Sequence, residues 1–144
     1  TTWKRLPGET INGLLWGAGA GNSKVQWYIR THKNVLNIFS KLWKVKPTEL
    51  LTSFDGLGIF RPWYSDASGK YWKTGKGWWH IDQNVKRIPQ RVTVQALVSL
   101  YDQNEYTGST CLIPDSHKLV GKKLTHLHKD DGHFVRVNPT HYNT

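Results

Sequence analysis

The 144-residue chain carries 20 Lys and Arg against 10 Asp and Glu, a formal net charge of +10, which favours anionic partners such as nucleic acid, an acidic protein or an anionic small molecule. The length suits one domain with one core. A single cysteine, Cys111, excludes an internal disulfide, and no apolar run is long enough to cross a membrane. Together with the lack of a usable Asn-x-Ser/Thr sequon, these features favour an intracellular protein.

The first third of the chain is predicted to be helical. Residues 1–21 show no regular pattern, and Asn22 or Ser23 can cap a helix that follows. Apolar residues then recur at helical spacing, with lysines, an arginine and an asparagine on the other faces. These apolar residues are Val25, Tyr28, Ile29, Val35, Leu36, Phe39 and Leu42. Pro47 ends this unit, and "PTELL" predicts one more short helical turn.

The period then changes to that of β-strands. Residues 91–102 alternate apolar and polar side chains and give the clearest strand pattern. "NEYTG" at 104–108 predicts a turn. Further strands are predicted at 53–60, 78–82, 109–114 and 133–137. We therefore predict an α+β, mainly β fold with an antiparallel sheet: one domain over 1–144, with a helical lead-in at 1–50 and strands in 51–144.

A His-x-Asp pair follows two tryptophans in "GKGWWHIDQN". Chance alone predicts about 0.3 such pairs in a chain of this composition, so the motif is weak by itself. His80 and Asp82 lie on a predicted strand, where residues i and i+2 share a face, so both can reach one point. They offer two of the three ligands of the two-His, one-carboxylate triad of non-haem Fe(II) oxygenases. The alternative is a strand-end histidine hydrogen-bonded to its neighbour. The second pair, His128 and Asp130, lies in a charged loop where solvated side chains are expected.

The segments "WWHIDQN" and "VQALVSLYDQNEYTGSTCLIPDSHK" resemble the phytanoyl-CoA dioxygenase family. In that family a His-x-Asp is followed by a strand, a polar turn ending in Gly, another strand, and a Pro-Gly-Ser-His-Lys type corner. The corner here is "PDSHK", with Asp115 in place of the usual Gly. The resemblance covers residues 25–120 and is most specific over 78–118.

The resemblance implies a double-stranded β-helix, which is a distorted jelly roll. It also implies Fe(II) held by His80 and Asp82, with 2-oxoglutarate as co-substrate. In such enzymes 2-oxoglutarate is decarboxylated with O2, and an unactivated C–H bond of a small-molecule substrate is usually hydroxylated. Because halogenating relatives have a small residue in place of Asp82, its presence favours hydroxylation.

The resemblance also requires a second histidine on a later strand and, beyond it, an arginine that binds 2-oxoglutarate. The separation between Asp82 and His141 along the sequence is acceptable for this second histidine, but no arginine follows His141. His117 belongs to the corner and is expected to make a hydrogen bond there. About five strands are predicted where a jelly roll has about eight, and the chain has no methionine. We therefore expect an excerpt that stops before the last strands, or else a family member that has lost catalysis.

Two further residues are weaker candidates for binding the co-substrate. Gln95 lies on a predicted strand that faces the site. A polar residue on the polar face of an ordinary sheet explains this glutamine equally well. Arg61 ends the first predicted strand and could meet a carboxylate, although a solvated strand end is the simpler interpretation.

Other classes of function compete with the oxygenase. Residues 70–80, "KYWKTGKGWWH", interleave lysines with aromatic rings, as single-stranded nucleic-acid platforms do. A catalytically inactive dioxygenase fold could likewise serve as a basic nucleic-acid-binding or structural assembly subunit. A zinc site is the third alternative, since some side chains are of types that zinc accepts, but their spacing matches no compact zinc motif. These side chains are Cys111, His117, His126 and His128.

Overall fold

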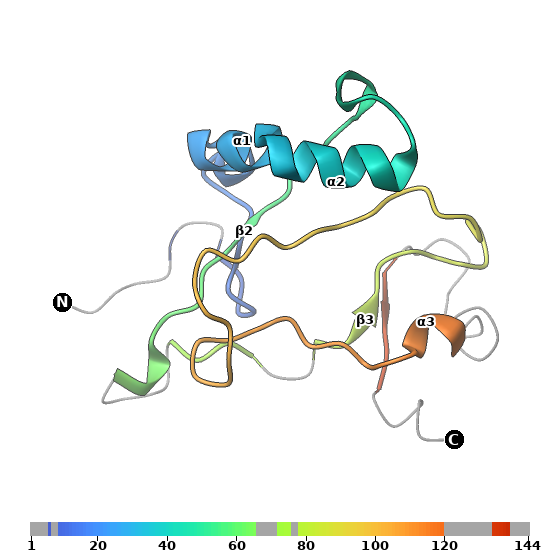
Figure 1. Cartoon of the computed structure of the whole chain (residues 1–144). Helices are drawn as coiled ribbons and strands as arrows, with labels where there is room; N and C mark the ends of the chain where they lie inside the picture. Colours follow the sequence, from blue (N-terminus) through green and yellow to red (C-terminus); the bar gives the residue numbers. More distant parts are fainter. Residues whose placement is uncertain (1–5, 7–8, 66–71, 76–77, 120–133, 139–144) are drawn as a thin grey trace. The chain divides into compact units, whose positions relative to one another are not determined.

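The computed structural model describes Leu6 and residues 9–65, 72–75, 78–119 and 134–138 (Figure 1). The chain forms two compact units, Thr1–Thr74 and Gly75–Thr144. The first unit contains helices α1 (Lys24–Thr31) and α2 (Lys33–Trp43) and strands β1 (Leu14–Leu15) and β2 (Leu57–Gly58). The second contains strands β3 (His80–Ile81) and β4 (Val135–Arg136) and helix α3 (Ser116–Leu119). Short 3-10 turns lie at Ala20–Asn22, Pro47–Glu49 and Trp63–Ser65. None of the described helices is long and apolar enough to cross a membrane.

The predicted helical run is confirmed, but it is divided into two helices at His32. The Ser23 hydroxyl accepts a hydrogen bond from the Gln26 amide and so caps α1, which decides between the two caps, Asn22 and Ser23, that the sequence allowed. His32 is extended, with φ −63° and ψ 131°, and its Nδ1 accepts from the Asn34 amide at 3.3 Å. An imidazole thus caps α2, a role that helical periodicity does not reveal. The α2 helix ends at Lys44, which has a left-handed backbone (φ 57°).

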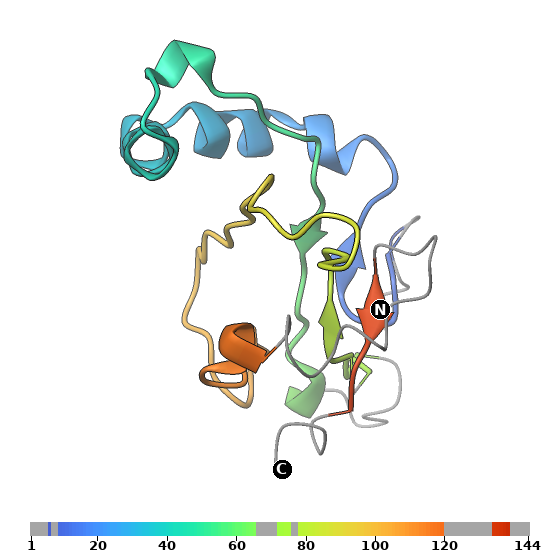
Figure 2. The ribbon, with the colours of Figure 1, turned by 90° about the vertical axis from the view of Figure 1, so that its right-hand side faces the viewer.

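In the first unit, β1 and β2 pair antiparallel, with Leu14 opposite Gly58 and Leu15 opposite Leu57 (Figure 2). The predicted strand at 53–60 is therefore confirmed at its centre. Its partner β1 lies in the segment predicted to be irregular, because two residues are too few to show a period.

Side chains of α1 bind the backbone just before β2. The Gln26 side-chain amide donates to the Asp55 and Gly56 carbonyls at 3.2 and 2.7 Å. The Arg30 guanidinium donates to the Gly21 carbonyl and, at 3.1 Å, to the Asp55 carbonyl. A Cβ at Gly21 would lie 2.7 Å from the Phe54 carbonyl oxygen, so a glycine is needed here for the close approach of the two backbone segments.

In the second unit, β3 and β4 pair antiparallel, with His80 opposite Arg136 and Ile81 opposite Val135 (Figure 1). Val135 and Val137 are buried and pack against Trp79 and Ile81. The strands predicted at 78–82 and 133–137 are therefore confirmed at their centres. The pairing joins segments more than fifty positions apart, which no local pattern could predict.

The strands predicted at 91–102 and 109–114 are not present in the structure. No strand of the described residues pairs with either segment, and side chains of both alternating sets are exposed, for example Val98 and Leu97. Alternation reports how a segment fits a pleated surface, but a strand also needs a hydrogen-bonded neighbour. The turn at 104–108 is confirmed, since the Asn104 side chain accepts from the Tyr106 and Thr107 amides at 2.8 and 3.1 Å. The described residues thus form few helices and small antiparallel sheets.

A polar turn follows β3 and is anchored by Asn84, whose side chain is fully buried. Its Oδ1 accepts from the backbone amides of Lys86 and Arg87 at 3.1 and 3.3 Å. The Gln83 side-chain amide closes the same turn by donating to the Ile88 and Gln90 carbonyls at 2.6 and 2.8 Å. This turn fixes the chain immediately after Asp82.

We expect Asn84→Ala to lower the free energy of unfolding by about 1–3 kcal/mol, because the part-buried Lys86 amide loses its acceptor and a fully buried side chain is truncated. Urea unfolding followed by tryptophan fluorescence measures this change. Gln90→Ala, at an exposed position in the same turn that uses only its backbone carbonyl, is the control and should change stability by less than about 0.5 kcal/mol. Equal stabilities of the two variants would contradict the role of Asn84 as the anchor of this turn.

Candidate metal centre

The β3 strand separates its side chains onto two faces. Trp79, just before β3, and Ile81 pack against the buried Val135 of β4 and against Val137 just after it. His80 alternates with them and therefore lies on the opposite face, which Asp82 shares by the same period of two. The sequence prediction that these two side chains converge is met in the structure, where they lie 3.3 Å apart.

Each imidazole nitrogen of His80 has its own neighbour. Nδ1 lies 2.7 Å from the Trp78 carbonyl oxygen, and Nε2 lies 3.3 Å from Asp82 Oδ1. Because a carbonyl oxygen only accepts, Nδ1 must carry a hydrogen and donate it. In the neutral ring, Nε2 then presents its lone pair towards a carboxylate oxygen. Two lone pairs that converge in this way are stabilised only by a cation between them, either a proton or a metal ion.

The donor set fits a divalent metal ion. Metal-binding histidines commonly donate their second ring N–H to a backbone carbonyl or carboxylate, which fixes the tautomer and orients the ring. Adjacent ligands of an octahedral ion, each at about 2.1 Å, are separated by about 3 Å, close to the 3.3 Å between His80 Nε2 and Asp82 Oδ1. The side chains are 23% and 49% exposed, so an ion can reach them. An imidazole with a carboxylate suits iron, and a co-substrate can fill the remaining positions.

Two aromatic rings enclose the His80 imidazole. The Trp78 ring centroid lies 4.4 Å from it at an interplanar angle of 37°, and that of Phe134 lies 4.8 Å from it at 29°. Together with the Nδ1 hydrogen bond, these contacts restrict rotation of the ring. Trp78 is close to His80 in the sequence, but Phe134 is brought to His80 only by the pairing of β3 with β4, which the sequence did not predict.

Within the described part of the chain, no third His, Cys, Asp or Glu joins His80 and Asp82 in a group able to hold a metal ion. The third ligand was left unplaced from the sequence, and His141, the candidate for it, lies outside the described residues, as do His126, His128 and His133. His117 and Cys111 are described and exposed. The zinc alternative gains no support from these two positions.

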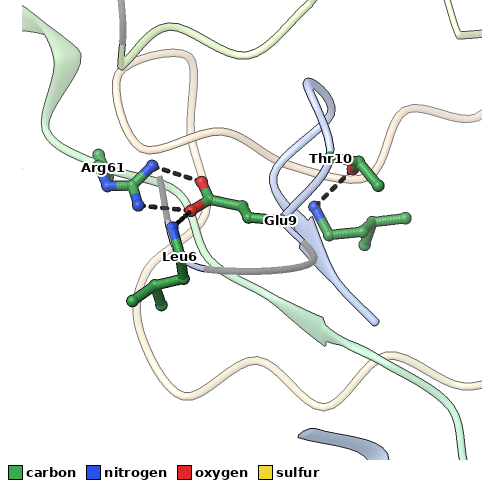
Figure 3. Close-up of polar contacts among 5 residues, drawn as sticks. Leu6, Glu9, Thr10 and Arg61 are labelled. Carbon is green, nitrogen blue, oxygen red and sulfur yellow. Dashed lines mark hydrogen bonds and ion pairs between the residues drawn. The ribbon is translucent and has the colours of Figure 1, made fainter. Parts of the chain in front are cut away.

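Arg61, a predicted carboxylate-binding residue, forms a buried ion pair with Glu9 (Figure 3). Both guanidinium NH2 groups bind the two Glu9 carboxylate oxygens, and the side chains are 9% and 3% exposed. Glu9 Oε2 also accepts from the Leu6 amide at 2.9 Å. Arg61 therefore ties the residues before β1 to the residues after β2, and a ligand carboxylate would have to displace Glu9.

Gln95, the other predicted co-substrate residue, is exposed and lies in the segment that forms no strand. Among the described residues, no hydrogen bond connects it to His80 or Asp82. Arg136, which was not predicted from the sequence as a site residue, lies directly opposite His80 on β4.

The basic aromatic segment at 70–80 is described only in part. Lys73 Nζ lies 4.0 Å from the Trp63 ring centroid, so this lysine covers an aromatic face. The Trp78 ring contacts His80 and Phe134. These two contacts occupy part of the surface that a stacked base would need.

Comparison with known proteins identifies the chain's relatives. The profile of the phytanoyl-CoA dioxygenase family matches residues 27–142. The chain belongs to the phytanoyl-CoA dioxygenase family. It is also 34% identical over 86 residues to "Ava biosynthesis cluster protein O" of Aspergillus versicolor, an alignment that covers 58% of this chain and 25% of that protein. The chain thus spans about a quarter of this curated relative. No solved structure matches it.

The phytanoyl-CoA dioxygenase family is a family of jelly-roll proteins that are, in general, oxygenases of the Fe(II)/2-oxoglutarate type. The comparisons do not support the alternative of an inactive nucleic-acid-binding or assembly subunit.

The structure also explains how Asp115 can replace the Gly that is usual in the corner motif of the family. Asp115 has a left-handed backbone (φ 59°), a conformation that favours the usual Gly. Asp is among the residues that tolerate it, and its carboxylate lies 2.7 Å from Lys118 Nζ.

Proposed function

We propose that His80 and Asp82 are metal ligands of an Fe(II)/2-oxoglutarate-dependent dioxygenase that hydroxylates a small-molecule or acyl substrate. The observation that carries this proposal is the hydrogen bond from His80 Nδ1 to the Trp78 carbonyl, which directs Nε2 to Asp82 Oδ1. Family membership supports Fe(II) as the metal and 2-oxoglutarate as the co-substrate. When bound, Fe(II) with 2-oxoglutarate supplies the oxidising chemistry.

The residues of this chain have positioning and shielding roles in this proposal. His80 is oriented by the Trp78 carbonyl and by two aromatic rings. Asp82 neutralises one of the two positive charges of the metal ion. Trp78 and Phe134 provide an apolar wall beside the reacting centre, which restricts water there.

The proposal also includes the fold to which this site belongs. The chain contributes to a single double-stranded β-helix domain, with a helical lead-in at 1–50 and sheet strands in 51–144. His141 is the proposed third ligand, consistent with the match of the family profile as far as residue 142. Residues 91–102 and 109–114 carry the strand pattern and would gain partner strands in that fold.

The test of this proposal uses the protein with anaerobic Fe(II) and 2-oxoglutarate, followed by O2. We expect a weak visible charge-transfer absorption before oxygen is added, and succinate afterwards. Asp82→Asn should weaken both signals, because it removes the negative charge but keeps the shape of the side chain. Asp102→Asn, at an exposed position outside the site, provides the matched control. If the wild-type protein gives neither the charge-transfer absorption nor succinate, the oxygenase proposal is refuted.

A further inference from the structure

Arg136 shares a cross-strand pair with His80. The Val137 amide donates to the Trp79 carbonyl at 3.1 Å, so the adjacent pair, His80 and Arg136, is a non-hydrogen-bonded pair of the antiparallel ladder. Side chains in such pairs lie closer together than those in hydrogen-bonded pairs. The guanidinium is therefore attached beside the metal-ligand candidate, on the face opposite Val135 and Val137.

The charges at this face leave room for an anion. Arg136 is exposed, and no carboxylate of the described residues forms an ion pair with it. The Arg136 guanidinium therefore carries a positive charge with which no described carboxylate pairs, and such a charge favours an anionic ligand at close range. Arginine recognises carboxylates through two parallel hydrogen bonds, which gives both affinity and orientation.

The surroundings of Arg136 indicate what else the ligand contains. Phe134, two residues earlier on the same face, is 43% exposed, and its ring centroid lies 6.2 Å from that of Trp78. A ligand that binds this surface would thus combine a carboxylate with an apolar body. In the family resemblance the 2-oxoglutarate-binding arginine follows the second histidine. With His141 as that histidine, Arg136 precedes it in the sequence and is left for the primary substrate.

We propose that Arg136 determines specificity by binding a carboxylate of the primary substrate, an organic acid with an apolar body. This inference rests on the proposed function for the identity of the site. It adds the chemical class of the substrate and the residue that recognises it.

The probe for the test is 3-phenylpropanoate, compared with its neutral amide in calorimetric titrations of the protein. We expect the wild-type protein to prefer the acid and Arg136→Gln to reduce that preference about 10-fold or more, the range expected for a lost charge-assisted bond. Arg136→Lys should retain part of it. Arg87→Gln, which removes the same charge from an exposed position on the turn after β3, should retain all of it.

Two results would overturn the inference. One is a preference that is absent from the wild-type protein or unchanged in Arg136→Gln. The other is a loss of 2-oxoglutarate affinity in Arg136→Gln, which would assign the arginine to the co-substrate. Succinate formed without primary substrate, measured on the same preparations, tests the oxygenase proposal separately. Succinate without an acid preference refutes only the role of Arg136, and an acid preference without succinate refutes only the oxygenase.

Discussion

We expect His80→Ala to reduce the affinity for a divalent metal by more than about 100-fold and to abolish 2-oxoglutarate turnover. Loss of an outer-shell partner of a metal ligand typically costs 10–100-fold, and loss of the ligand itself should cost more. Titration with Mn(II), followed by the paramagnetic signal of the free ion, measures affinity without requiring activity. Succinate formation measures turnover.

His117→Ala is the matched control for this variant. His117 is exposed in α3, forms no group with His80 and Asp82, and was expected from the sequence to belong to the corner. Its loss should leave metal affinity and succinate formation within about 2-fold of the wild type, as for most surface substitutions. If His80→Ala and His117→Ala behave alike, His80 is not a metal ligand.

The second large effect is expected at the buried ion pair of the first unit. Glu9→Ala should lower the free energy of unfolding by about 3–5 kcal/mol, because Arg61 is left with an uncompensated charge at 9% side-chain exposure. The variant also removes the acceptor of the Leu6 amide. Urea unfolding provides the measurement.

A double variant separates an unpaired charge from a simple loss of packing. Glu9→Leu combined with Arg61→Met replaces both charges with apolar side chains of similar size, which is often neutral or stabilising for a buried pair. We therefore expect the double variant to be more stable than Glu9→Ala by about 2 kcal/mol or more. A double variant as unstable as the single one would show that the charge pair is not the cause.

Local features of the sequence predicted several parts of this structure. The cap at Ser23, the helical period and the Asx turn at Asn104 depend on neighbours within four residues, so the sequence shows them directly. The convergence of His80 and Asp82 is of the same kind, because the strand period alone places i and i+2 on one face.

Other features depend on contacts between distant segments. The alternation at 91–102 predicted a strand, but the structure gives it no partner among the described residues. The His32 cap and the Glu9–Arg61 ion pair were missed because each depends on a specific side-chain geometry. Composition and period carry no information about such geometry.

Motif order and strand period are local properties of the chain, and they were enough to indicate the family and the two neighbouring metal-ligand candidates. The orientation of His80, the rings beside it and the position of Arg136 opposite it follow instead from tertiary contacts. These contacts depend on the register between β3 and β4, which is set by the packing of Trp79 and Ile81 against Val135 and Val137, more than fifty positions away in the sequence.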